Sequence, residues 1–161
     1  MKRVIYPGTF DPVTFGHIDI VERASDLFDE VVVTVAKNPA KTCMFSVEER
    51  TVMLHESLKH LDNVKVDSFD GLVVDHAKAI GAVGIIRGLR AVSDFEYEFQ
   101  MALMNRKLNG DLSTIFLMPH EKYTYLNSTI IRNLAQFNSD VSDFVPQVVV
   151  DYMAKKHTGA K

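Results

Sequence analysis

Glycine and proline residues near the start of the chain surround a threonine and a histidine in a pattern that suits phosphate binding. Residues 6–17 read YPGTFDPVTFGH, between a short apolar strand and an amphipathic run over 18–28. Gly8 and Gly16 let the backbone approach a ligand closely, and a helix start offers unpaired N–H groups to an anion. His17 could donate a hydrogen bond or bring a positive charge to a phosphate oxygen. The alternative is a glycine-rich turn that binds nothing, with His17 as a cap or surface residue.

Two arginines form the second group with chemical potential. Residues 85–90 read IIRGLR, so Arg87 and Arg90 follow an apolar strand with a flexible glycine between them. The planar fork of a guanidinium group suits the oxygens of a phosphate. Ion pairing of both arginines with Asp94, Glu96 or Glu98 is the alternative.

Lys41 and a pair of hydroxyls complete the candidate set. Lys41 lies in a loop that follows a β-branched strand, where a lone lysine is usually only solvated. Ser128 and Thr129 lie at a predicted helix start, where their hydroxyls and the helix N–H groups could bind phosphates. An ordinary N-cap would need only Ser128.

The elements that must position these residues alternate along the chain. Apolar and β-branched runs predict strands over 3–6, 31–36, 64–69, 83–87 and 114–118. Helices are expected over 18–28, 46–60, 72–80 and 93–108, from about 128, and after Pro146, with capping boxes at 46–49 and 93–96.

This alternation predicts an α/β fold in which a Rossmann-like, parallel, five-stranded sheet has helices on both faces. We expect one domain over 1–161. Ligands of such sheets gather at the carboxyl ends of the strands, and all the candidate residues follow strands. The sequence therefore predicts that they meet in one site.

Composition narrows the class of protein. With 161 residues and a net charge of -3, the chain lacks the basic field that holds nucleic acid, and no run reaches membrane-spanning length. A single cysteine, Cys43, and the lack of metal spacing among the histidines predict no protein-bound metal. We expect a cytoplasmic protein. Neither a P-loop nor a GxGxxG fingerprint is present, which disfavours P-loop kinases and dinucleotide oxidoreductases.

The two motifs together resemble a known family. Thr14-x-Gly16-His17 matches the (H/T)xGH signature of the nucleotidylyltransferase superfamily, and GTFDPVTFGH with IRGLRAVSDFEYE is similar to bacterial phosphopantetheine adenylyltransferases. The similarity covers nearly the whole chain, including FLMP at 116–119 and a stretch that contains Pro39, Lys41, Phe45, Glu48, Glu49 and Arg50.

The resemblance implies transfer of AMP from ATP to 4′-phosphopantetheine, giving dephospho-coenzyme A and pyrophosphate. It also implies a homohexamer, Mg²⁺ that arrives with ATP, and coenzyme A as an inhibitor. Independently of the resemblance, the position of Met101 and Met104 on a predicted helix favours core or subunit contacts over a cofactor box. The implied catalytic groups are His17, Lys41 and Arg90, and Thr9, Lys41, Val73 and Arg87 would bind phosphopantetheine. ATP would contact Thr9, Phe10, His17, Gly88, Leu89, Arg90, Glu98, Tyr123, Thr124, Tyr125, Leu126, Asn127, Ser128 and Thr129.

Two departures from the family and two other functions stay open. Phe15 stands where relatives carry asparagine, and Asn127 stands where serine is frequent. The acceptor could instead be nicotinamide mononucleotide or glycerol phosphate, which the IRGLR and DFEYE segments disfavour. A binding module without turnover is the other alternative, and the intact His17, Lys41 and Arg90 argue against it.

Overall fold

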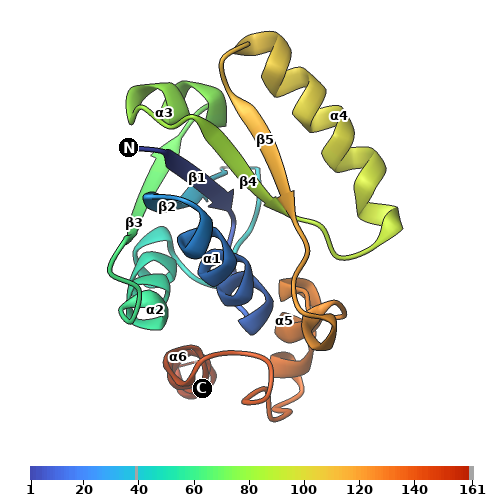
Figure 1. Ribbon diagram of the computed structural model, residues 1–161. Coiled ribbons are helices and arrows are strands. Elements are labelled where there is room, and N and C mark those ends of the chain that lie inside the picture. The colour runs from blue at the N-terminus through green and yellow to red at the C-terminus, as the bar shows by residue number, and fades with distance from the viewer. Residues whose placement is uncertain (39, 160–161) are drawn as a thin grey trace.

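The computed structural model describes residues 1–38 and 40–159, which form a parallel sheet between two layers of helices (Figure 1). Pro39, part of the family-like stretch, lies outside the described residues. The strands are β1 (Arg3–Gly8), β2 (Glu30–Lys37), β3 (Val64–Asp70), β4 (Gly84–Gly88) and β5 (Ser113–Leu117). The helices are α1 (Phe15–Leu27), α2 (Val47–Leu58), α3 (Val73–Ala79), α4 (Val92–Leu108), η1 (Glu121–Tyr123), α5 (Ser128–Gln136) and α6 (Gln147–Thr158).

The five strands pair in the order β3-β2-β1-β4-β5, and every pair is parallel. The chain builds outward from β1 to β3, then crosses back so that β4 pairs with the other side of β1. The strand order therefore reverses between β1 and β4, which is where open α/β sheets place their ligands.

Alternating side chains of the central strands supply two cores. On one face, Val4 and Ile86 pack in a large buried cluster to which α1, α2, α5 and α6 contribute. On the other face, Ile5 and Ile85 pack with Val74 and with further apolar residues of α3 and the segment before β5. These two clusters confirm the expected sheet with helices on both faces.

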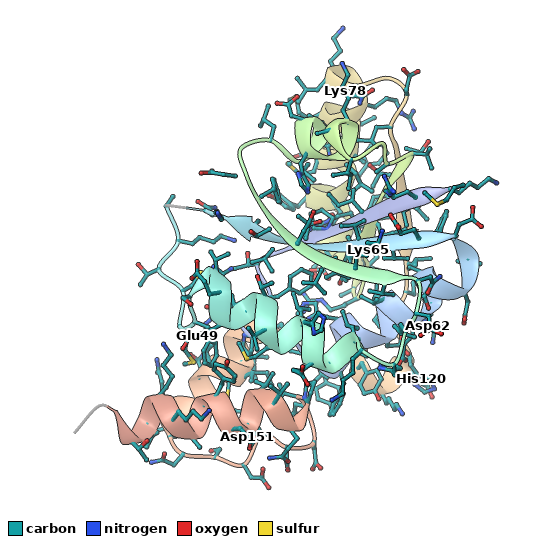
Figure 2. The ribbon with its side chains drawn as sticks, turned by 90° about the vertical axis from the view of Figure 1, so that its left-hand side faces the viewer. Glu49, Asp62, Lys65, Lys78, His120 and Asp151 are labelled. Atoms are coloured by element: carbon teal, nitrogen blue, oxygen red, sulfur yellow. The ribbon has the colours of Figure 1, made fainter. Side chains whose placement is uncertain are left out.

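The C-terminal helix lies beside α2 (Figure 2). Lys156 of α6 forms an ion pair with Glu49 of α2, with 3.0 Å between Nζ and Oε2. The last helix therefore packs in the same layer as α1 and α2.

Of the two predicted capping boxes, one is confirmed and one is wrong. Glu49 N–H donates to Ser46 Oγ at 3.1 Å, and Ser46 N–H donates to Glu49 Oε2 at 2.8 Å. By contrast, α4 already begins at Val92, with Ala91 at its N-cap and no side-chain cap. The helical turn starts earlier than the sequence indicated because Asp94 N–H bonds to the carbonyl of Ala91, which leaves Ser93 inside the first turn.

Candidate active site

A cleft of about 770 Å³ opens where the strand order reverses, beyond the carboxyl ends of β1 and β4. It brings together most of the residues that the sequence singled out, which come from the segments after β1, β2, β4 and β5. The predicted residues that line it are Thr9, Phe10, Gly16, His17, Lys41, Arg87, Gly88, Arg90, Glu98, Leu126, Asn127, Ser128 and Thr129.

His17 occupies the first turn of α1, held by a reciprocal capping interaction with Thr14. Thr14 N–H donates to His17 Nδ1 at 3.0 Å, and His17 N–H donates to Thr14 Oγ1 at 3.4 Å. Nδ1 is thus an acceptor, so the ring proton lies on Nε2 when the imidazole is neutral. The capping and ligand-binding interpretations of His17 are therefore compatible, because each uses a different ring nitrogen.

The charge state of His17 follows from its surroundings. Burial, followed by the positive charges of Arg90 and Arg87, lowers the pKa of His17 to about 4. At neutral pH the free protein therefore carries a neutral imidazole there. Of the two roles allowed by the sequence, hydrogen-bond donor and cation, this environment favours the donor.

Phe10 fixes the shape of the loop after β1. Its φ of 50° lies in the left-handed region that non-glycine residues rarely adopt, and its side chain is 3% exposed. The ring packs edge-on against both Tyr6 and His17, with centroids 5.4 and 5.1 Å apart. A Cβ on Gly8 would lie 2.8 Å from Phe10 Cζ, so the close approach requires glycine at that position.

Arg87 is held by a buried acid. Its Nε and Nη2 donate to the two carboxylate oxygens of Glu98 at 2.8 and 2.7 Å, and Nη1 donates to the carbonyl of Pro7 at 3.0 Å. Burial opposes the charge on Arg87, but the bonds to Glu98 outweigh it and hold the arginine pKa above its usual value. The predicted alternative of ion pairing is thus present for Arg87, and both carboxylate oxygens of its partner Glu98 accept hydrogen bonds from it.

Arg90 and the start of α5 meet at the other side of the cleft. Arg90 Nη1 donates to the carbonyl of Leu126 at 2.7 Å, and its Nε lies 3.5 Å from Asp94 Oδ2. The helix begins at Ser128 as predicted, but the alternative of Ser128 as an ordinary N-cap is wrong, because Asn127 Oδ1 accepts the N–H of Ile130 at 2.8 Å. Ser128 is instead the first helical residue, and its hydroxyl donates to the carbonyl of Pro12 at 2.7 Å.

Five of the predicted residues do not line this cleft. Val73 begins α3 and borders the second core, while Leu89 uses its N–H for the carbonyl of Leu117 at 2.9 Å. The other three belong to the segment around η1. Tyr123 lies beside Gly16, tilts against Phe15 and lines a second, smaller cavity. Thr124 bonds back to Glu121, and Tyr125 is exposed beside Phe144.

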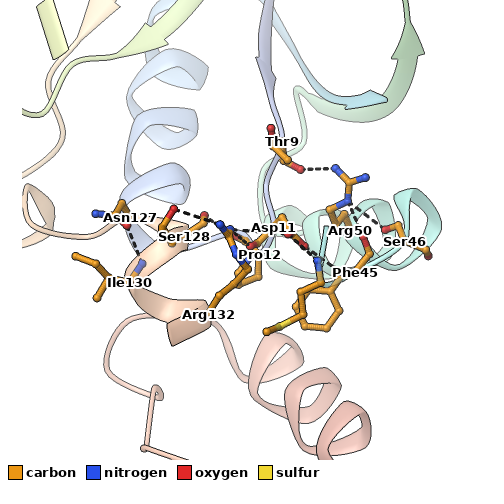
Figure 3. Close-up of polar contacts among 12 residues, drawn as sticks. Thr9, Asp11, Pro12, Phe45, Ser46, Arg50, Asn127, Ser128, Ile130 and Arg132 are labelled. Carbon is orange, nitrogen blue, oxygen red and sulfur yellow. Dashed lines mark hydrogen bonds and ion pairs between the residues drawn. The ribbon is translucent and has the colours of Figure 1, made fainter. Parts of the chain in front are cut away.

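The structure adds residues that the sequence analysis did not assign. Figure 3 shows Asp11, Arg50 and Arg132 at the centre of polar contacts that join the segments around the cleft. Asp11 lies within the first motif, and Arg132 lies one helical turn after Ser128, which is a spacing that could have indicated it. Tyr6, Thr42, Cys43, Ser93, Asp94 and Tyr97 also line the cleft.

The acidic side chains of the cleft all lie beside donor groups of the protein itself. Among the described residues that line it, the carboxylates are those of Asp11, Asp94 and Glu98, and each faces N–H donors or a guanidinium group. No three metal-binding side chains gather elsewhere in the part of the chain that the structure describes, and no helix there is long and apolar enough to cross a membrane.

The fold and the cleft define a class of protein, and comparison with known proteins agrees. A cationic cleft at the strand-order reversal, with a TxGH turn leading into the first helix, is an arrangement for binding a polyphosphate. The sequence model of the Cytidylyltransferase-like family matches residues 5–134, which places the chain among the nucleotidyltransferases.

Relatives that are more than 50% identical show the family to which the chain belongs. The chain is 54% identical to the phosphopantetheine adenylyltransferase of Caldanaerobacter subterraneus subsp. tengcongensis, over 97% of this chain and 98% of that protein. It is 52% identical to that of Alkaliphilus metalliredigens, over 97% and 99%. The chain belongs to the phosphopantetheine adenylyltransferase family.

A solved structure supports the fold alone. The putative nicotinate-nucleotide adenylyltransferase from Vibrio parahaemolyticus superposes with a TM-score of 0.70 at 19% identity, covering 96% of this chain and 99% of its own. At that identity the likeness carries no information on the acceptor.

Proposed function

We propose that this protein transfers the adenylyl group of ATP to 4′-phosphopantetheine, forming dephospho-coenzyme A and pyrophosphate. The identity of 54% to a phosphopantetheine adenylyltransferase, over nearly the whole of both chains, carries the proposal. A phosphate oxygen of the acceptor attacks the α-phosphorus, and the bond from that phosphorus to the oxygen bridging to the β-phosphate breaks. Pyrophosphate leaves with the bonding electron pair, so the protein needs neither a covalent nucleophile nor a strong base.

The chain's own residues would then act by positioning and by charge stabilisation. His17 would donate its Nε2 hydrogen bond to the α-phosphate as charge builds there, helped by the N–H of Phe10. Lys41, exposed on the rim of the cleft, would bridge the attacking phosphate and the α-phosphate. Arg90 with the hydroxyl of Thr129 would stabilise the leaving pyrophosphate.

Magnesium enters this scheme as part of the substrate. Because both carboxylate oxygens of Asp11 and of Glu98 accept hydrogen bonds from the protein, the ion would be held chiefly by the phosphates of ATP. Bound there, it would neutralise part of the charge on the triphosphate.

Assembly into a hexamer is part of the proposal, and α4 offers a surface for it. This helix lies along β5 at the edge of the sheet (Figure 1). Most of its apolar side chains are exposed. Large exposed apolar patches mark contact surfaces in soluble proteins. The exposed residues are Val92, Phe95, Tyr97, Phe99, Met101, Leu103, Met104 and Leu108. Of the two expected roles of Met101 and Met104, core or subunit contact, their exposure favours the subunit contact.

A cytoplasmic location and inhibition by coenzyme A complete the proposal. Both follow from the reaction, because ATP is a cytoplasmic substrate and coenzyme A shares the pantetheine arm and adenylyl group of the product.

The His17→Ala variant separates an enzyme from a binding module. We expect pyrophosphate release from ATP and phosphopantetheine to fall about a hundredfold, since one hydrogen-bond donor to the developing charge is lost. Calorimetric binding of a non-hydrolysable ATP analogue should persist. Turnover at the parent rate would refute the role given to His17.

A further inference from the structure

Asp11 is a buried carboxylate that binds the segment after β2. Its side chain is 2% exposed, Oδ2 accepts the N–H of Met44 at 2.8 Å, and Oδ1 accepts the N–H of Phe45 at 2.9 Å. These donors stand 33 and 34 positions later in the chain. One side chain of the β1 loop thus fixes the end of the segment that carries Lys41, which we define as the Lys41 loop (residues 40–45).

Arg50 ties the same two segments from the opposite side. It is 4% exposed, and its Nη1 donates to the carbonyl of Thr9 at 2.7 Å. Its Nε donates to the carbonyls of Phe45 and Ser46 at 3.1 and 3.2 Å. Figure 3 shows this guanidinium between Thr9 and the start of α2. The carboxylate of Asp11 accepts the N–H of Phe45, and the guanidinium of Arg50 donates to the carbonyl of Phe45. Both backbone polar groups of Phe45 are therefore hydrogen-bonded to buried side chains.

Asp11 also connects to the side of the cleft where Thr129 lies. Arg132 Nη1 donates to the Asp11 carbonyl at 2.7 Å and lies 3.8 Å from Asp11 Oδ2. Arg132 Nη2 donates to Thr129 Oγ1 at 3.2 Å. The close bond of Arg132 is to the backbone carbonyl of Asp11, so the link to α5 persists when only the side chain of Asp11 is changed.

We propose that Asp11 and Arg50 are positioning residues, which hold the Lys41 loop against the β1 loop so that Lys41 reaches the reacting phosphates. This inference rests on the proposed function, because it assigns a purpose to the position of Lys41. Lys41 itself lies on an exposed part of the loop, so the anchors at 44 and 45 supply the order that its own surroundings do not. A displacement of a catalytic group by about 1 Å can cost roughly a hundredfold in rate.

The test replaces the carboxylate of Asp11 with an amide of the same shape. In Asp11→Asn one oxygen still accepts an N–H, but the side-chain NH₂ must face the other N–H. Glu30→Gln is the matched control, because Glu30 is 8% exposed and bonded to Arg3 and Lys65 at the start of β2, away from the cleft. It makes the same chemical change at another buried carboxylate, whose partners Arg3 and Lys65 are partly exposed.

Pyrophosphate release is measured for Asp11→Asn in the parent and in the Lys41→Ala background, with thermal unfolding of each protein. We expect kcat to fall about a hundredfold in the parent background, with a smaller change in the KM for ATP. In the Lys41→Ala background the further loss should be less than about threefold, because the positioned group is gone. Glu30→Gln should keep the parent kcat even if it unfolds at a lower temperature.

An equal loss on both backgrounds, or the parent kcat in Asp11→Asn, would overturn the proposal. If Asp11→Asn does not fold, Arg50→Lys on the same two backgrounds carries the same test, with the same two outcomes. Amide hydrogen exchange at Met44 and Phe45 gives a readout without turnover: it should quicken in Asp11→Asn and not in Glu30→Gln. Unchanged exchange would refute the anchoring, whereas a parent protein inactive with phosphopantetheine would refute the proposed function instead.

Discussion

Acidification should destabilise the protein through His17, whose pKa in the folded chain is about 4 against 6.5 for an ordinary histidine. Between these values the unfolded chain binds a proton at this ring while the folded chain does not. Unfolding therefore takes up a proton, and the free energy of unfolding falls as the pH falls from about 6.5 to about 4. Below that window the folded protein is protonated too, and the loss stops growing.

The size of the loss follows from the shift. A difference of 2.5 between the two pKa values, at 1.36 kcal/mol each, gives about 3 kcal/mol at the acid end of the window. That is a large share of the stability of a typical domain. A variant without the imidazole isolates the contribution of His17 to this loss.

His17→Asn provides that comparison. The asparagine oxygen can accept the N–H of Thr14 in place of Nδ1, and it does not titrate. Urea unfolding of both proteins across the window should show the parent losing about 3 kcal/mol more than the variant. An NMR titration of the His17 ring in the free protein should give a midpoint well below 6.5. A midpoint at or above 6.5, or parallel stability curves, would refute the neutral, donor-only state derived for this ring.

Three substitutions test the packing around the cleft. Gly8→Ala should lower the free energy of unfolding by about 1–3 kcal/mol and lower turnover, because its Cβ would lie 2.8 Å from the buried ring of Phe10. Gly110→Ala is the control, because a Cβ there would meet no atom within 4 Å. Equal unfolding temperatures of the two variants would contradict the clash. Glu98→Gln should lower the free energy of unfolding by about 2 kcal/mol, measured by urea, since it weakens both bonds to the guanidinium; no loss would show that the pair contributes no net stability. Asn127→Ala should cost about 1 kcal/mol through the lost cap of α5, whereas parent stability would argue against that cap.

Local patterns were sufficient to predict the sheet. Five of the six residues of the run VVVTVA are buried along β2, as expected for a strand covered on both faces. The Ser46–Glu49 capping box starts α2 at the predicted place. Because carboxyl ends of parallel strands meet at one edge, the sequence also predicted that His17, Lys41 and Arg90 would share a cleft, and they do.

Contacts between distant segments were beyond the sequence. The anchoring of the Lys41 loop by Asp11 joins residues 33 and 34 positions apart, and no periodicity records such a pairing. The same holds for Ser128, whose hydroxyl reaches a carbonyl 116 positions earlier, so Asn127 is left to cap the helix. Helix boundaries depend on these choices, which single-sequence patterns do not contain.

Pyrophosphate release with ATP, magnesium and one acceptor at a time tests the central claim most directly. The acceptors are 4′-phosphopantetheine, nicotinamide mononucleotide and glycerol phosphate. The proposed function predicts release with phosphopantetheine alone, and with it the appearance of dephospho-coenzyme A. Release with another acceptor would keep the nucleotidyltransferase chemistry but contradict the assigned substrate. Silence with all three, from folded protein that still binds ATP, would contradict the assignment of this cleft as an active site.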